Sequence, residues 1–138
     1  MITRARRRAA FFDLRHDLLA SDSALAILEA AVRHRSAGDL LVCVSNAAVG
    51  VEPPGARAEF TADLVLYADT TAGAGSEVVV EAMARLGLDA AQCFAYGDHR
   101  EGLTILGVVG NPRVVGGDPV LAELARDRGW PILYAPQS

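Results

Sequence analysis

Short apolar runs alternate with amphipathic stretches along this chain, and the alternation limits its fold more than any other feature. Runs rich in Val, Leu and Phe are typical of strands buried on both faces of a parallel sheet, and the stretches between them have helical periodicity. The sequence therefore predicts an α/β fold, a three-layer sandwich around a Rossmann-like parallel sheet of about five to six strands. The predicted strands are 9–14, 40–45, 64–67, 93–96, 112–115 and 131–134.

Capping residues and glycines mark the ends of three predicted helices between these strands. The predicted helices begin near Ser21 to Ser23, at Ser76, and at Asp118 with Pro119, and they stop at Gly38, Gly87 and Gly129 respectively. The segment 73–76 (GAGS) resembles a phosphate-binding loop, but no Gly-Lys follows it, so we interpret it as a turn before a helix cap.

The 138 residues predict a single domain, 1–138, with a formal net charge of −4 that argues against nucleic-acid binding. Residues 1–8 carry a basic cluster that we interpret as a solvated N-terminal arm. Cys43 and Cys93 lie in apolar runs and are expected to be buried thiols in a reducing compartment. No apolar run has the length of a membrane helix, so the expected location is cytoplasmic. His34, between Arg33 and Arg35, is expected at a solvated helix end.

All 13 basic residues are Arg, and the chain contains no Lys. This absence excludes every mechanism that needs a side-chain amine, such as Schiff-base chemistry or a phosphate-loop Lys.

Polar residues follow the first, second and fourth predicted strands, and the carboxyl ends of strands are where α/β sheets place their sites. The three segments are 13–17 (DLRHD), 45–46 (SN) and 97–101 (GDHRE). Four stretches of the chain resemble the haloacid dehalogenase superfamily, and specifically its phosphoserine-phosphatase-like branch. Three of them contain these segments, 9–23, 44–54 and 87–106, and the fourth, 110–133, resembles the end of such a domain. The resemblance covers nearly the whole chain.

The resemblance implies that Asp13 occupies the position of the catalytic nucleophile and that Ser45 occupies the position of the phosphoryl-binding residue. The general acid/base of the family falls on Arg15, which cannot transfer a proton near neutral pH. The family's Lys falls near Val79, and the second acid of the fourth motif falls on Gly102, next to Glu101.

The resemblance implies that the positions of the family's Mg²⁺ ligands are Asp13, the main-chain carbonyl of Arg15, and Asp98. The Arg15 guanidinium can pair with both carboxylates and repel a divalent cation. We therefore expect no cofactor, with weak Mg²⁺ binding through Asp13 and Asp98 as the residual alternative. Only 18–44 separates the first two motifs, enough for one helix, so the helical cap of this branch is expected to be missing. Capless members use a neighbouring subunit as a lid or act on large substrates, which implies a homo-oligomer.

Two functions of different classes follow. The first is a repurposed, metal-independent enzyme that acts on an organic metabolite in the pocket corresponding to the family's active site. The second is a non-catalytic relative that binds a metabolite or a partner protein. A residual phosphohydrolase that uses Asp13 is a third possibility. The candidate catalytic residues are Asp13, Arg15, His16, Asp17 and Asp98, and the candidate substrate-binding residues are Ser45, Asn46, His99 and Arg100.

Simpler structural roles stay open for these residues. Asp13 can be a strand-end carboxylate paired with an arginine, His16 and Asp17 can belong to an exposed turn, and Ser45 with Asn46 can cap a helix.

Overall fold

A parallel sheet of six strands forms the centre of the computed structural model, which describes residues 8–13, 24–45, 62–67, 75–97, 103–115 and 119–133. The strand order is β3-β2-β1-β4-β5-β6, and every described pairing is parallel. The predicted sheet of five to six strands is therefore confirmed. The strands are β1 (Ala9–Asp13), β2 (Leu40–Ser45), β3 (Leu64–Tyr67), β4 (Phe94–Gly97), β5 (Asn111–Val115) and β6 (Ile132–Leu133).

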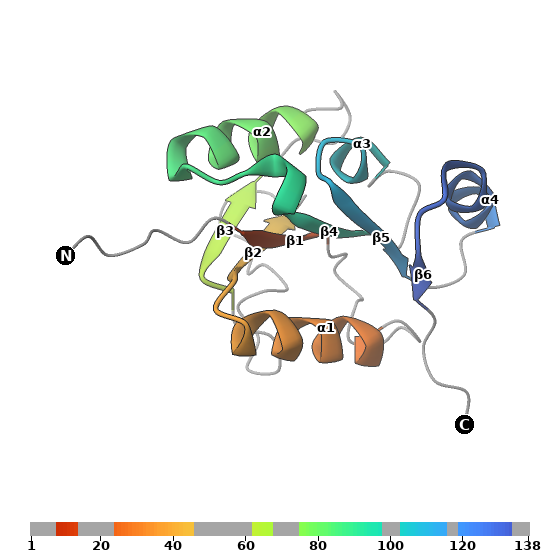
Figure 1. Cartoon of the computed structure of the whole chain (residues 1–138), viewed down its shortest axis with the longest axis horizontal. Coiled ribbons are helices and arrows are strands. Elements are labelled where there is room, and N and C mark those ends of the chain that lie inside the picture. Colours follow the sequence, from red (N-terminus) through yellow and green to blue (C-terminus); the bar gives the residue numbers. More distant parts are fainter. Residues whose placement is uncertain are drawn as a thin grey trace.

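Helices cover both faces of the sheet, as Figure 1 shows. One face is covered by α1, and the other by α2, α3 and α4, so the three-layer sandwich is confirmed. Between β1 and β2 the described residues hold one helix, α1, as the short spacing of the first two motifs predicts. The helices are α1 (Ala24–Ser36), α2 (Gly75–Leu86), α3 (Leu103–Leu106) and α4 (Pro119–Arg128).

Two apolar clusters fill the spaces between the layers. The larger cluster joins Phe11 and Val44 of the sheet to Val79 of α2 and Leu121 of α4, and all four are 0–1% exposed. The smaller cluster joins Phe12 and its sheet neighbours to α1. Because consecutive strand residues point to opposite faces, β1 feeds both clusters and all five of its residues are buried.

The element boundaries differ from the predicted ones by one or two residues. The fourth strand begins at Phe94 rather than Cys93, since the preceding residues form a short 3₁₀ helix, Ala90–Gln92, capped by the Asp89 side chain. The sequence predicts neither this turn nor α3, because both are too short to show an apolar period. The Cys43 and Cys93 side chains are buried as expected, and burial raises the pKa of the Cys93 thiol.

Candidate functional site

The carboxyl ends of β1, β2 and β4 lie side by side at the centre of the sheet. Asp13, the last residue of β1, is in register with Val44 of β2 and with Gly97, the last residue of β4. Ser45 follows Val44 in the same strand. The predicted convergence of these three strand ends is therefore confirmed for the backbone.

This position is also where the order of the strands reverses. From β1 the chain proceeds to β2 and β3 on one side, whereas β4, β5 and β6 extend on the other. In open α/β sheets such a reversal leaves a crevice outside the carboxyl ends of the two central strands, and ligands bind there. Asp13 ends one of these two strands, so the topology places it at the edge of that crevice.

Asp13 is the predicted site residue whose side chain the structure describes, and it is 6% exposed. A carboxylate is costly to bury without polar partners, so such burial is unusual at a position that serves only solubility. Its neighbour Phe12 points to the opposite face of the sheet, into the cluster beneath α1. Asp13 is thus held by a strand that is packed on both faces.

Most of the other predicted site residues lie outside the described residues. Ser45 ends β2, and its side chain is not among those described. The remaining candidates outside the described part of the chain are Arg15, His16, Asp17, Asn46, Asp98, His99 and Arg100, together with Glu101 and Gly102. Within the described part, no three His, Cys, Asp or Glu side chains are grouped to hold a metal ion.

Position 79, near which the resemblance places the family Lys, lies in the apolar core. Val79, the residue nearest to the expected family Lys, is 0% exposed and packs in the larger apolar cluster. A lysine at this point would lose its hydration among apolar side chains and could not serve a polar site. Val79 is therefore a core residue of α2. That helix begins at Gly75, one residue before the predicted cap Ser76.

A buried polar network joins Arg8, just before β1, to Asp39, just before β2, and sequence reasoning missed it. The Asp39 carboxylate accepts two hydrogen bonds from the Arg8 guanidinium, from Nε at 3.0 Å and from Nη2 at 3.1 Å. It also lies 2.8 Å from Nδ1 of His34. His34 and Asp39 are both 6% exposed. Burial alone would raise the pKa of Asp39, but the hydrogen bonds and charges of Arg8 and His34 outweigh it and hold the pKa below its ordinary value of 3.8.

The network continues from His34 into the sheet. Nε2 of His34 lies 2.6 Å from the Tyr96 hydroxyl, and the Tyr96 ring stacks on Phe12 with centroids 4.7 Å apart. Burial raises the pKa of Tyr96, although the charges of Arg113 and Arg33 act in the opposite direction. The hydroxyl therefore keeps its proton near neutral pH. Since an ionised carboxylate can only accept, we assign the Nδ1 proton of His34 to the bond with Asp39.

Two sequence expectations are wrong in this region. The sequence predicts His34 at a solvated helix end, whereas the residue is buried against Phe94, with ring centroids 4.6 Å apart. It also predicts Arg8 in a solvated arm, whereas Arg8 pairs with Asp39; residues 1–7 lie outside the described residues. The cause is Gly38, whose φ of +83° turns the chain so that the Asp39 amide bonds the His34 carbonyl at 2.9 Å.

Comparison with known proteins identifies a curated relative of this chain and solved structures of similar fold. No protein-family model matches the chain. It is 31% identical over 86% of its length to the "Inhibition of morphological differentiation protein" of Streptomyces azureus, and it spans about half (48%) of that curated relative.

Solved structures with the same fold include phosphatases. A protein of unknown function from Bordetella pertussis Tohama I has a TM-score of 0.69 at 19% identity, with 94% of this chain and 99% of that one covered. A phospho-aspartyl intermediate analogue of phosphoserine phosphatase has a TM-score of 0.66 at 10% identity, with 98% and 96% covered. For deoxy-D-mannose-octulosonate 8-phosphate phosphatase from Haemophilus influenzae the TM-score is 0.57 at 16% identity, with 87% and 74% covered.

The chain therefore has the fold of the haloacid dehalogenase superfamily, as the sequence motifs predict. Among the described residues, no helix combines the length and the apolar character needed to cross a membrane.

Proposed function

We propose that this protein uses the haloacid-dehalogenase fold without Mg²⁺-dependent phosphate hydrolysis, and that its site acts on an organic metabolite. The observation that carries the proposal is the buried carboxylate of Asp13 at the reversal of strand order, combined with Arg15 two residues later. The nucleophile position is kept. The acid/base position holds a group that cannot exchange a proton near neutral pH.

The charges available at this site do not fit a phosphatase of this family. Asp13 and Asp98 could offer carboxylate oxygens to Mg²⁺, but the sequence places Arg15 two residues after Asp13. A fixed cation competes with a divalent ion for the same carboxylates. The chain also contains no lysine that could neutralise a phosphoryl group beside Asp13.

The same residues suit an anionic organic ligand. In this proposal Arg15 orients a carboxylate or stabilises a developing negative charge, and His16 with Asp17 transfers protons. Ser45, Asn46, His99 and Arg100 follow the ends of β2 and β4 in sequence, and we assign them to ligand binding.

A second candidate is a non-catalytic, regulatory protein that binds a metabolite or a partner protein. The Streptomyces azureus relative favours it, because the name of that protein describes an effect on development and no reaction. In this alternative the Asp13 site binds its ligand without converting it.

A calorimetric titration with Mg²⁺ tests the loss of the metal. We expect no saturable binding to the wild-type chain and measurable binding to Arg15→Asp, because this change replaces a repelling cation with a third carboxylate. Adding Asp13→Asn to Arg15→Asp should abolish the gain. Binding to the wild type that disappears in Asp13→Asn alone would contradict the proposal.

A further inference from the structure

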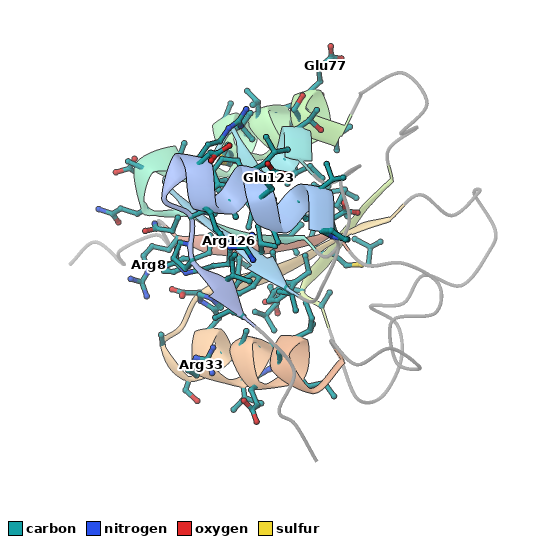
Figure 2. All side chains as sticks on the ribbon, turned by 90° about the vertical axis from the view of Figure 1, so that its right-hand side faces the viewer. Arg8, Arg33, Glu77, Glu123 and Arg126 are labelled. Atoms are coloured by element: carbon teal, nitrogen blue, oxygen red, sulfur yellow. The ribbon has the colours of Figure 1, made fainter. Side chains whose placement is uncertain are left out.

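Three arginines gather on the face of the sheet that α1 covers. Arg8 directly precedes β1, Arg33 lies in the last turn of α1, and Arg113 lies in β5. Arg113 is in register with Tyr96, which packs in the cluster beneath α1, so both side chains lie on this face. Figure 2 shows Arg8 beside the sheet and Arg33 on α1. Three separate elements therefore bring a guanidinium to one region of the molecule.

Two aromatic side chains of β4 lie among these arginines. The guanidinium carbons of Arg8 and Arg113 are 5.8 Å and 5.2 Å from the centroid of the Phe94 ring. Burial raises the pKa of Tyr96, and the nearby charges of Arg113 and Arg33 act in the opposite direction. Phe94 and Tyr96 are two residues apart in one strand, so they share a face of the sheet. The three positive charges are thus grouped around neighbouring side chains.

The positive charges of this group exceed the negative charge that balances them. Asp39 pairs with Arg8 and with His34. Within the ranges that the structure describes, neither Arg33 nor Arg113 forms an ion pair with a carboxylate. Even with His34 neutral, three arginines and one carboxylate leave two positive charges in excess. Like charges that are held close together repel one another, and an anion bound among them relieves this repulsion.

The guanidiniums keep N–H donors for such an anion. Arg113 is half-buried, and its Nη1 donates to the Pro112 carbonyl at 3.0 Å, so among the described contacts its Nε and Nη2 are left. A guanidinium that lies over an aromatic ring presents its N–H groups at the edge of its plane, where two of them match two oxygens of a phosphate. Arg8 uses Nε and Nη2 for Asp39 and keeps Nη1, and its side chain is 42% exposed.

We propose that Arg8, Arg33 and Arg113 bind a dianionic phosphate group. Nε and Nη2 of Arg113 bind two of its oxygens, and the other two arginines supply further donors and charge. The two excess positive charges match a phosphate monoester, whose charge approaches −2 above its second pKa of about 6. A single carboxylate would balance only half of them. Because Asp13 follows Phe12 and points to the opposite face of the sheet, this site is separate and does not rest on the proposed function.

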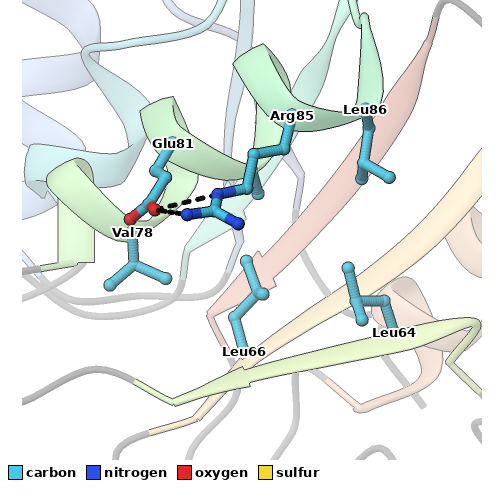
Figure 3. Close-up of a pocket in the computed structure, with 7 residues that line it drawn as sticks. Leu64, Leu66, Val78, Glu81, Arg85 and Leu86 are labelled. Atoms are coloured by element: carbon cyan, nitrogen blue, oxygen red, sulfur yellow. Dashed lines mark hydrogen bonds and ion pairs between the residues drawn. The ribbon is translucent and has the colours of Figure 1, made fainter.

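Arg85 of α2 provides the matched control (Figure 3). Its Nη2 lies 2.8 Å from Oε1 of Glu81, one helical turn earlier, and the two side chains are 78% and 62% exposed. The charge of Arg85 is therefore balanced within its own helix, and the side chains beside it include the apolar Leu66 and Val78, which carry no donor. Arg85→Gln changes the net charge of the protein as much as Arg113→Gln does, but it leaves the proposed site intact.

Isothermal titration calorimetry with inorganic phosphate at about pH 8 tests the inference, because phosphate is largely dianionic there. We expect saturable binding with a Kd on the order of 1 mM. Arg113→Gln and Arg33→Gln should each weaken it about tenfold, whereas Arg85→Gln should bind as the wild type does. Arg33 is exposed, so its variant should keep the fold even if Arg113→Gln does not. Acetate, a monoanionic carboxylate, should bind at least about tenfold more weakly than phosphate.

Amide NMR signals locate the bound phosphate. In the wild type, phosphate should shift the signals of Arg33, Tyr96 and Arg113. Shifts confined to residues 45–46 and 98–101 would place the anion in the site at Asp13 and would overturn the inference. It would also be overturned by a lack of saturable binding or by acetate that binds as tightly as phosphate. An equal loss in Arg85→Gln and Arg33→Gln would overturn it too, since net charge alone would then explain the effect.

Discussion

Replacing Asp39 with asparagine is expected to lower the free energy of unfolding by about 3 kcal/mol. The carboxylate is buried and accepts from both Arg8 and His34, so the amide would turn an N–H donor toward one of these donors. Most of the cost comes from the buried His34 side, because the Arg8 side chain is 42% exposed and water can solvate it. For a domain of this size we expect a decrease in Tm of about 10 °C.

The pH dependence of the same variant gives an independent check. The pKa of Asp39 is lower in the folded chain than its ordinary value of 3.8, so the folded state favours the ionised form. Its stabilisation is complete above that ordinary value and is lost as the pH falls through the lower, folded value. The difference between wild type and Asp39→Asn should therefore be constant near neutral pH and shrink below about pH 4.

Thermal and denaturant unfolding at fixed protein concentration measure both effects. Glu123→Gln is the matched control, since Glu123 is exposed on α4 and should change the free energy of unfolding by less than about 0.5 kcal/mol. A cost for Asp39→Asn no larger than that of the control would show that the network does not stabilise the fold.

Phe12→Ala is expected to cost about 4 kcal/mol. Phe12 is 0% exposed on the central strand, and its ring stacks on Tyr96 with an interplanar angle of 7°. Its removal leaves a cavity beneath α1 and takes away the surface that holds the Tyr96 hydroxyl toward His34.

Val80→Ala provides the comparison, because Val80 is 48% exposed on α2 and should change stability by less than about 0.5 kcal/mol. Urea unfolding followed by circular dichroism distinguishes the two variants. A Phe12→Ala protein as stable as Val80→Ala would mean that the packing between α1 and the sheet is not as described.

The fold could be predicted from the sequence because its strands are short apolar runs separated by stretches of helical periodicity. Runs such as 40–45 and 64–67 are continuous apolar segments, and the structure places β2 and β3 within these bounds. The helix ends were predictable because glycine follows each of the three long helices within two residues. The 3₁₀ turn at 90–92 was missed because its cap acts over too few residues to leave a pattern.

Local sequence could not predict the burial of His34. Its neighbours Arg33 and Arg35 are exposed, and the partners that allow burial come from β4 and from Asp39 beyond the helix end. The sequence does contain one indication of this burial, because His34 and Asp39 lie five residues apart on either side of a glycine that ends the helix. It becomes meaningful only when the sheet brings Tyr96 to the same place.

The sequence predicted where in the sheet the candidate site lies better than it predicted which side chains form it. Apolar strands that end in Asp13 and Gly97 place polar segments together because parallel neighbours end at one edge of the sheet. Spacing alone could not show that Val79, near the expected position of the family Lys, faces the core.

Phosphate hydrolysis measured on a generic aryl phosphate tests the central claim most directly. The wild-type chain, assayed with and without Mg²⁺, should give the same background rate as Asp13→Asn, because no group at position 15 can protonate a leaving group and no lysine supports the phosphoryl charge. Turnover that requires Mg²⁺ and disappears in Asp13→Asn would contradict the account and would identify the protein as a working phosphatase.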